Sequence, residues 1–187
     1  MKSFFWAILG IALFLTACGG ENTDGNTNKN AIHFDQTEIA DALHSFFSWY
    51  GDNADRIGEI GFAIEKGGHL TLDNAKLQLY LAELKKSGFV SDELIADEVK
   101  YYQACAKIWA KEPSNQSTVG LQLDRYLCDF ENVSAYEKAP ANATITGDRA
   151  KVVMTVAPNN THTFDMKKEN GKWYLAKPSC AEPSVQY

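Results

Sequence analysis

The chain has 187 residues, of which 45% are hydrophobic, and its formal net charge is −6. Nucleic-acid binding depends on clustered Lys and Arg side chains, so this acidic composition argues against a nucleic-acid partner. The hydrophobic content and the length that follows the N-terminal segments suit one domain with a single core.

The first predicted element is a signal peptide over residues 1–17. Lys2 supplies a positive charge, and residues 4–15 are apolar apart from one glycine. Twelve residues are too few to span about 30 Å of hydrocarbon, which takes roughly 20, so a signal peptide is favoured over a transmembrane helix. The sequence LTAC (15–18) resembles the bacterial lipobox at all four positions. The resemblance implies that Cys18 becomes the first mature residue and carries a lipid; the alternative is an ordinary secretory signal with a stray cysteine.

The segment after the cysteine is predicted to be a tether. Residues 18–33 are rich in Gly, Asn and Thr and can bury little, so we expect them to be disordered. A lipid on Cys18 implies a bacterial cell envelope protein whose only membrane contact is this anchor. Gly19 stands where, by resemblance to enterobacterial sorting, an Asp would retain the protein in the inner membrane. We therefore expect the outer membrane, with the domain in the periplasm.

Apolar residues at helical spacing predict a first helix from Thr37 to near Gly51. Glycines interrupt residues 52–70, which we expect to form loop or short turns. A second helix should follow, with Asp73 as its N-cap and Gly88 after its end.

A third helix is predicted from the N-cap Ser91 to about Ala110. At 100° per residue, its apolar residues share one half of the circumference: Leu94, Ile95, Val99, Tyr101, Tyr102, Cys105, Ala106, Ile108 and Trp109. Glu98 falls in the same half. A carboxylate facing a core needs a partner, a proton or water. In one interpretation, Glu98 pairs with Arg125 or a tyrosine hydroxyl, or reaches water. In the other, it is a pocket carboxylate with a raised pKa that can act as a general acid or base.

Beyond Leu121 the hydrophobic period changes from 3.6 to 2. Strands are predicted around 142–146 and at 150–157, 161–168 and 172–177, separated by short turns. The dipeptide Asn170-Gly171 is the strongest hairpin signal of the chain.

Helices followed by hairpin-connected strands predict an α+β domain over residues 34–180, with a tail at 181–187. About three N-terminal helices should pack on one face of a curved antiparallel sheet of three to five strands, in a cone-like shape.

This arrangement resembles the nuclear-transport-factor-2-like superfamily, also called cystatin-like cones, and within it a family of bacterial lipoproteins of unknown function. The resemblance lies in FFSWY (46–50), YLAELKKSGFVS (80–91), LDRYLCDF (123–130) and ENGKWYL (169–175). In that family a proline tends to follow the first aspartate of the third segment, where this chain has Arg125. The resemblance implies a fold rather than an activity, because this fold serves isomerases, dehydratases, transport factors and immunity proteins.

Three cysteines remain after Cys18, which predicts one disulfide and one free thiol in an oxidising compartment. All three pairings are open; we favour Cys105–Cys128, with Cys180 as the rival partner for either. No metal site is expected, since the chain has no Cys-x-x-Cys and its histidines are scattered.

The sequence contains no catalytic motif such as Gly-x-Ser-x-Gly or His-Glu-x-x-His. We therefore expect a non-catalytic envelope lipoprotein without a cofactor that binds a partner protein or a small ligand; an immunity-type role against a periplasmic toxin is one version. The alternative is an isomerase- or hydrolase-like enzyme that uses Glu98 or Asp129 with a tyrosine such as Tyr50 or Tyr102. A structural role in the envelope is a third possibility. A deep cavity with converging carboxylate and tyrosine would favour a ligand or an enzyme, and an exposed apolar patch would favour a protein partner.

Overall fold

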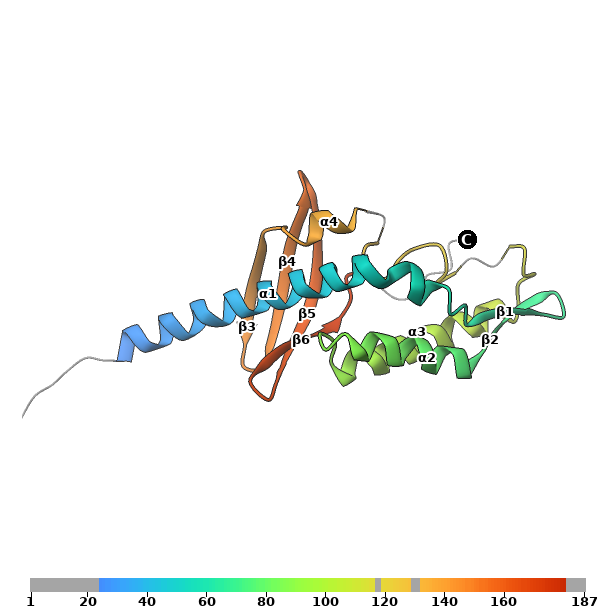
Figure 1. The fold of residues 1–187 in the computed structure, drawn as a ribbon, viewed down its shortest axis with the longest axis horizontal. Helices are drawn as coiled ribbons and strands as arrows, with labels where there is room; N and C mark the ends of the chain where they lie inside the picture. Colours follow the sequence, from blue (N-terminus) through green and yellow to red (C-terminus); the bar gives the residue numbers. More distant parts are fainter. Residues whose placement is uncertain (1–23, 117–118, 129–131, 181–187) are drawn as a thin grey trace, which may run out of the picture.

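Helix α1 (Asp24–Gly58) is the longest element and crosses one face of the sheet (Figure 1). The computed structural model describes residues 24–116, 119–128 and 132–180, with side chains from residue 34 onward. The helix buries its apolar side chains at helical spacing, as expected: Ile39, Leu43, Phe46, Phe47, Tyr50 and Ile57.

The helix exceeds its expected bounds at both ends. It begins at Asp24, within the segment 18–33 that was expected to be disordered, because a nucleated helix gains one hydrogen bond for each residue added. It also continues through Gly51 to Gly58. A Cβ on Gly51 would lie 3.0 Å from a methyl carbon of Val133, so this glycine permits close packing within the helix rather than ending it. The predicted signal peptide and Cys18 lie outside the described residues.

The prediction of an irregular segment at 52–70 is wrong. After α1, strands β1 (Ala63–Lys66) and β2 (His69–Leu72) form an antiparallel hairpin. Its turn is Gly67-Gly68, with φ of 65° and 82°, the positive values that a two-residue hairpin turn requires. Each strand has only four residues, too few for a periodic hydrophobic pattern.

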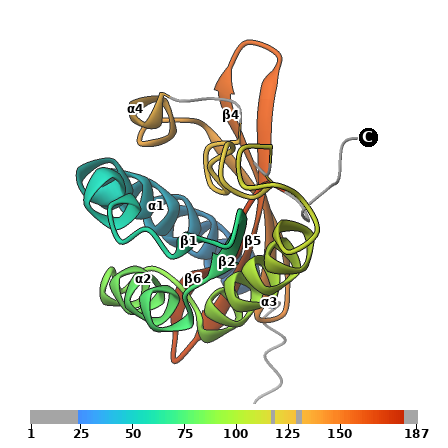
Figure 2. The same ribbon diagram turned by 90° about the vertical axis from the view of Figure 1, so that its right-hand side faces the viewer.

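The next two helices confirm the sequence prediction. Helix α2 (Asn74–Lys86) is capped by Asp73, whose carboxylate accepts two backbone N–H groups, and α3 (Asp92–Trp109) is capped by the Ser91 hydroxyl. The turn between them is tied to the sheet, because Ser91 N donates to the carbonyl of Leu175 at 3.0 Å. Figure 2 shows α1 and α2 on the same side of the sheet, with α3 in front of the lower part of the sheet.

The second half of the chain forms a four-stranded antiparallel sheet in the order β3-β4-β5-β6. The strands are β3 (Ala141–Thr146), β4 (Arg149–Ala157), β5 (Asn160–Glu169) and β6 (Lys172–Lys177). The predicted turn Asn170-Gly171 is confirmed, with φ of 50° and 79°. A short helix that the sequence did not predict, α4 (Val133–Tyr136), precedes the sheet. The chain is thus an α+β domain of helices followed by an antiparallel sheet with β3 and β6 at its edges.

Side chains alternate between the two faces of the sheet. Those of β4 are buried at every second position, beginning with Ala150, on the face that α1 covers. Phe47 of α1 meets Phe164 of β5 edge to face, with ring centroids 5.4 Å apart. This contact joins the helical half to the sheet, while the C-terminal end of α1 extends past the strands towards α2 and α3 (Figure 1).

Candidate functional site

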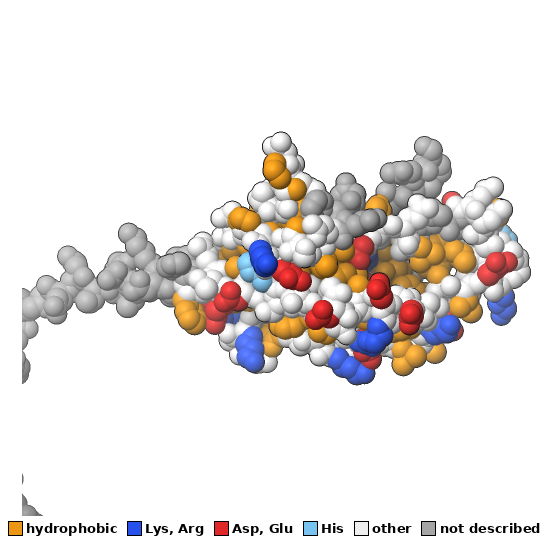
Figure 3. Space-filling view, turned by 45° about the horizontal axis from the view of Figure 1, so that its top comes forward, with side chains coloured by type: hydrophobic (Ala, Val, Ile, Leu, Met, Phe, Trp, Pro, Cys, Tyr) orange, Lys and Arg blue, Asp and Glu red, His pale blue; other side chains and the backbone are white. Residues whose placement is uncertain are grey.

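A cavity of about 940 Å³ lies between the C-terminal half of α1, the chain that leads into β1, and segment 120–126. Five aromatic side chains contribute to its lining: Tyr50, Phe62, Tyr80, Tyr102 and Tyr126. Figure 3 shows hydrophobic side chains gathered in a hollow in the right half of the molecule, with acidic side chains beside it. The volume falls in the range of about 300–1,000 Å³ that is typical of small-molecule sites.

The start of segment 120–126 is fixed against α3. The Trp109 indole donates to the carbonyl of Val119 at 2.8 Å. Gly120 has φ of 75°, and a Cβ there would lie 2.5 Å from the sulfur of Cys105. Only glycine fits both the backbone conformation and the close approach, so this residue sets how near the segment comes to the helix.

Asp124 organises the middle of the segment. Its Oδ1 accepts the backbone N–H groups of Tyr126 (2.7 Å) and Leu127 (2.9 Å), which closes an Asx-type turn. The Tyr50 hydroxyl of α1 donates to Oδ2 of the same carboxylate. Burial, followed by the charge of Asp124, raises the pKa of Tyr50 far above its ordinary value. Three donors therefore occupy Asp124 and hold the segment against α1.

A disulfide closes the far end of the segment. Cys128 is bonded to Cys180, with a Cα–Cα distance of 5.5 Å, and Cys180 N donates to the Arg125 carbonyl at 3.2 Å. One disulfide and one free thiol are thus present among the described cysteines, but the preferred pairing Cys105–Cys128 is wrong. The chain after β6 returns beside the turn at Asp124, whereas the sulfur of Cys105 faces Gly120. Burial raises the pKa of the Cys105 thiol to about 11.

Glu98 lies beneath the cavity with no exposed surface, which confirms the predicted helical phase of α3. Its Oε1 is 3.4 Å from Arg125 Nη1, and its Oε2 accepts from the Tyr80 hydroxyl at 3.3 Å. Burial raises the pKa of Glu98 to about 7, although the charge of Arg125 opposes the change. The carboxylate therefore has the expected partners and also a raised pKa, but it does not line the cavity.

Arg125 is itself buried, with 6% of its surface exposed. Its Nη2 donates to Asp97 at 2.8 Å, and the guanidinium lies 3.8 Å from the centroid of the Tyr101 ring. Its Nε and Nη1 have no hydrogen-bond partner within the described parts of the chain. Two carboxylates and an aromatic ring thus hold this cation in place at the cavity.

The structure brings together three of the four candidate catalytic residues. Tyr50 and Tyr102 line the cavity, and Glu98 lies behind them. Asp129 lies outside the described residues. Burial raises the pKa of the Tyr102 phenol far above its ordinary value, with a further contribution from the charge of Glu98. Two phenols and one buried carboxylate thus lie together at the cavity.

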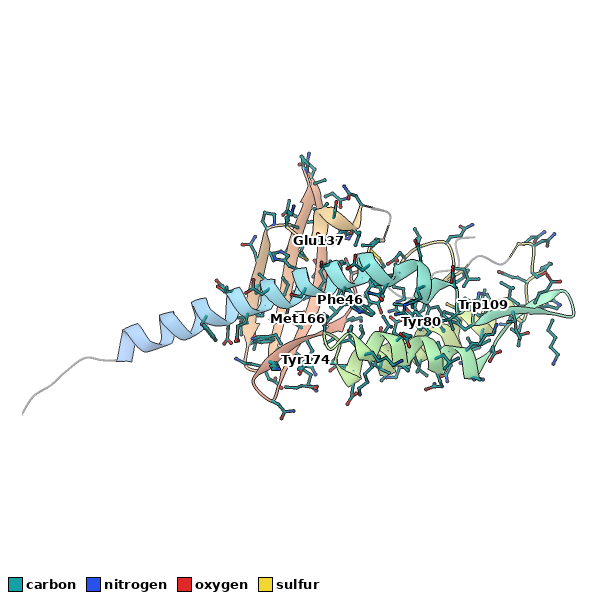
Figure 4. The ribbon with its side chains drawn as sticks, viewed as in Figure 1. Phe46, Tyr80, Trp109, Glu137, Met166 and Tyr174 are labelled. Carbon is teal, nitrogen blue, oxygen red and sulfur yellow. A yellow bond between two sulfur atoms is a disulfide. The ribbon has the colours of Figure 1, made fainter. Side chains whose placement is uncertain are left out.

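Several residues of the site were not predicted from the sequence. Tyr80 of α2 was not among the candidate residues; Figure 4 places it between α2 and the C-terminal half of α1. Phe62 stood in a segment that was expected to form loop or short turns, and Asp124 stood in one for which no helix or strand was predicted. The run of two charged residues and one aromatic residue at 124–126 was the available signal for part of this lining.

Among the described residues, no group of three or more His, Cys, Asp or Glu side chains is placed to hold a metal ion. None of the helices in that part of the chain has the length and apolarity needed to cross a membrane. Comparisons with protein-family models, curated protein sequences and solved structures find no match to this chain.

Proposed function

We propose that this chain is a lipid-anchored protein of the bacterial envelope whose α+β domain binds a small organic ligand in the aromatic cavity and does not transform it. The cavity of about 940 Å³ with its five aromatic side chains is the observation that carries the proposal. The lipobox resemblance at Cys18 supports the anchor, and Gly19 supports the outer membrane with a periplasmic domain. The cone-like shape and membership of the nuclear-transport-factor-2-like superfamily belong to the same proposal.

A ligand is favoured over a partner protein because the large exposed hydrophobic side chains are dispersed. Phe34 lies on α1, Leu79 on α2 and Val153 on β4. Leu121 and Leu123 are also exposed, but both line the cavity. Protein interfaces usually gather such residues into one patch, and single scattered ones are ordinary at a surface.

Binding is favoured over the enzymatic alternative because the carboxylates are hydrogen-bonded or buried and the phenols stay protonated. Asp124 already accepts three hydrogen bonds, and Glu98 has no exposed surface. Tyr50 and Tyr102 stay protonated at neutral pH, since burial raises both pKa values. A general acid or base has to reach the proton that it transfers. Neither Asp124 nor Glu98 is free to reach a ligand in the cavity.

The test is a variant that fills the cavity. A Cβ on Gly58, which lines the cavity at the end of α1, would meet no atom within 4 Å, so Gly58→Trp places an indole in open space. Leu79→Trp adds the same ring at an exposed position outside the lining and serves as the control. The purified full-length chain is screened by ligand-observed NMR against neutral, anionic and cationic fragments of similar size.

We expect the wild type and Leu79→Trp to bind the same subset of fragments and Gly58→Trp to lose at least tenfold in affinity for them. The proposal is overturned if no fragment binds the wild type, or if Gly58→Trp leaves the affinities unchanged.

A further inference from the structure

The aromatic side chains of the cavity form two groups of rings in contact. Phe62 lies 4.5 Å from Tyr102 and 5.1 Å from Tyr80, between ring centroids, and Tyr50 lies 5.1 Å from Tyr126. The face of an aromatic ring carries partial negative charge. A cation within about 6 Å of such faces is attracted to them, most strongly where water is excluded.

Two of the four tyrosine hydroxyls of the lining add acceptors rather than donors. The Tyr50 hydroxyl donates its hydrogen bond to Asp124, and the Tyr80 hydroxyl donates its hydrogen bond to Glu98. A phenol has one hydrogen and can accept through its oxygen, so these two side chains can offer only lone pairs to a ligand. These two hydroxyls suit a ligand that brings N–H donors or a positive charge.

The charges at the cavity are mainly negative. Three carboxylates contribute to the lining: Asp55, Glu59 and Asp124. Asp55 is exposed on the last turn of α1, and Glu59 is exposed directly after that helix. Lys76 is an exposed cation at the rim, with its Nζ 3.5 Å from the carbonyl of Gly61. Carboxylates therefore outnumber free cations at the mouth.

Arg125 is the only Lys or Arg side chain among the described lining residues. Asp97 and Glu98 already lie 2.8 and 3.4 Å from its guanidinium, and both sides of that contact are buried or half-buried. An anionic ligand would have to compete with these two carboxylates and pass Asp55 and Glu59. The electrostatics therefore disfavour an anion.

We infer that the ligand of this cavity is a small organic cation bearing an ammonium group, held by aromatic faces and attracted by the carboxylates of the mouth. The inference rests on the proposed binding function and names its ligand class. A bare metal ion fits poorly, because the volume is that of an organic molecule and no cluster of three ligating side chains occurs in the described chain. Quaternary and primary ammonium groups are the cations that aromatic cages recognise.

The experiment compares two ligands that differ in charge and share a shape. Choline and 3,3-dimethylbutan-1-ol are titrated into the full-length wild-type protein by calorimetry and NMR, at low and at high salt. We expect choline to bind at least tenfold more tightly than its neutral isostere and to lose affinity as salt increases. Gly58→Trp should abolish binding of both.

A charge variant identifies the source of the preference. Asp55→Asn combined with Glu59→Gln changes only exposed side chains and should weaken choline at least threefold without altering the binding of the neutral isostere. Asp52→Asn, on the same helix but outside the lining, is the matched control and should change neither.

The cation inference is overturned if choline binds no more tightly than the isostere. It is also overturned if every fragment whose binding is weakened by Gly58→Trp is neutral or anionic. Either result leaves the binding function standing. The absence of any Gly58→Trp-sensitive ligand instead removes the binding function itself, so the two failures are distinguishable.

Discussion

Glu98 and Asp97 both contact the Arg125 guanidinium. The Glu98 contact is the longer one, 3.4 Å from Oε1 to Nη1, and the Asp97 contact to Nη2 is 2.8 Å. Removing the charge of Glu98 therefore leaves the buried arginine with a carboxylate partner. The large penalty of about 3–5 kcal/mol for stranding a buried ion should not arise.

The first prediction follows from the raised pKa of Glu98. Between its ordinary pKa, near 4.5, and about 7, the folded state holds a proton that the unfolded state has lost. The free energy of unfolding should therefore fall as pH rises through this window, by on the order of 3 kcal/mol, and then level off. Glu98→Gln should lack this decline. Urea unfolding at pH 5 and pH 7.5 measures it, with Glu65→Gln as an exposed control; equal pH dependence in wild type and Glu98→Gln would contradict the prediction.

The second prediction concerns the disulfide. Cys128 and Cys180 are 52 positions apart, so their bond restricts a long loop of the unfolded chain, and Cys180→Ala should lower the free energy of unfolding by about 2–4 kcal/mol. Because the bond also fixes the end of segment 120–126, ligand affinity should fall as well. Peptide mapping without reduction should recover the 128–180 crosslink and a free Cys105; a crosslink that contains Cys105 would refute the assignment.

The third prediction separates backbone strain from steric contact. Gly120 and Gly147 both have positive φ, but only at Gly120 would a Cβ collide with a neighbour, the sulfur of Cys105. Gly147→Ala should lower the free energy of unfolding by about 1 kcal/mol, because of the backbone conformation alone. Gly120→Ala should cost roughly 1–3 kcal/mol more and should displace the cavity lining. Chemical denaturation of both variants measures the difference. Equal losses of unfolding free energy would contradict the prediction and show that segment 120–126 can shift away from Cys105 at little cost.

The fourth prediction concerns the anchor. Thioether lipidation requires the sulfur of Cys18, so Cys18→Ser should leave the chain unlipidated. Metabolic labelling with a fatty-acid analogue measures this, and Cys105→Ser provides a control that keeps the lipobox intact. Label in Cys18→Ser at the wild-type level would reject the lipobox interpretation.

Much of the fold could be predicted because its signals are local. Capping at Asp73 and Ser91 defined two helices, alternation defined the four strands, and the phase of α3 placed Glu98 in the core. Signals of this kind depend on neighbours within a few residues.

The cavity could not be predicted, because it joins segments that are distant in sequence. The contact between Tyr50 and Asp124 spans 74 positions. Gly51 gave a misleading local signal, since close packing against Val133 outweighed its tendency to end a helix. The disulfide was missed for a related reason: nothing local shows that the chain after β6 returns to the turn at Asp124.

The length of α1 has a consequence for the place where ligands are captured. Its 35 residues, at about 1.5 Å each, make a rod of about 50 Å. One end projects past the sheet and the other borders the cavity (Figure 1). If Cys18, six positions before Asp24, carries a lipid, this helix is a stalk that can hold the mouth as much as about 50 Å from the bilayer. From that height the domain would collect solutes of the aqueous compartment rather than molecules dissolved in the membrane.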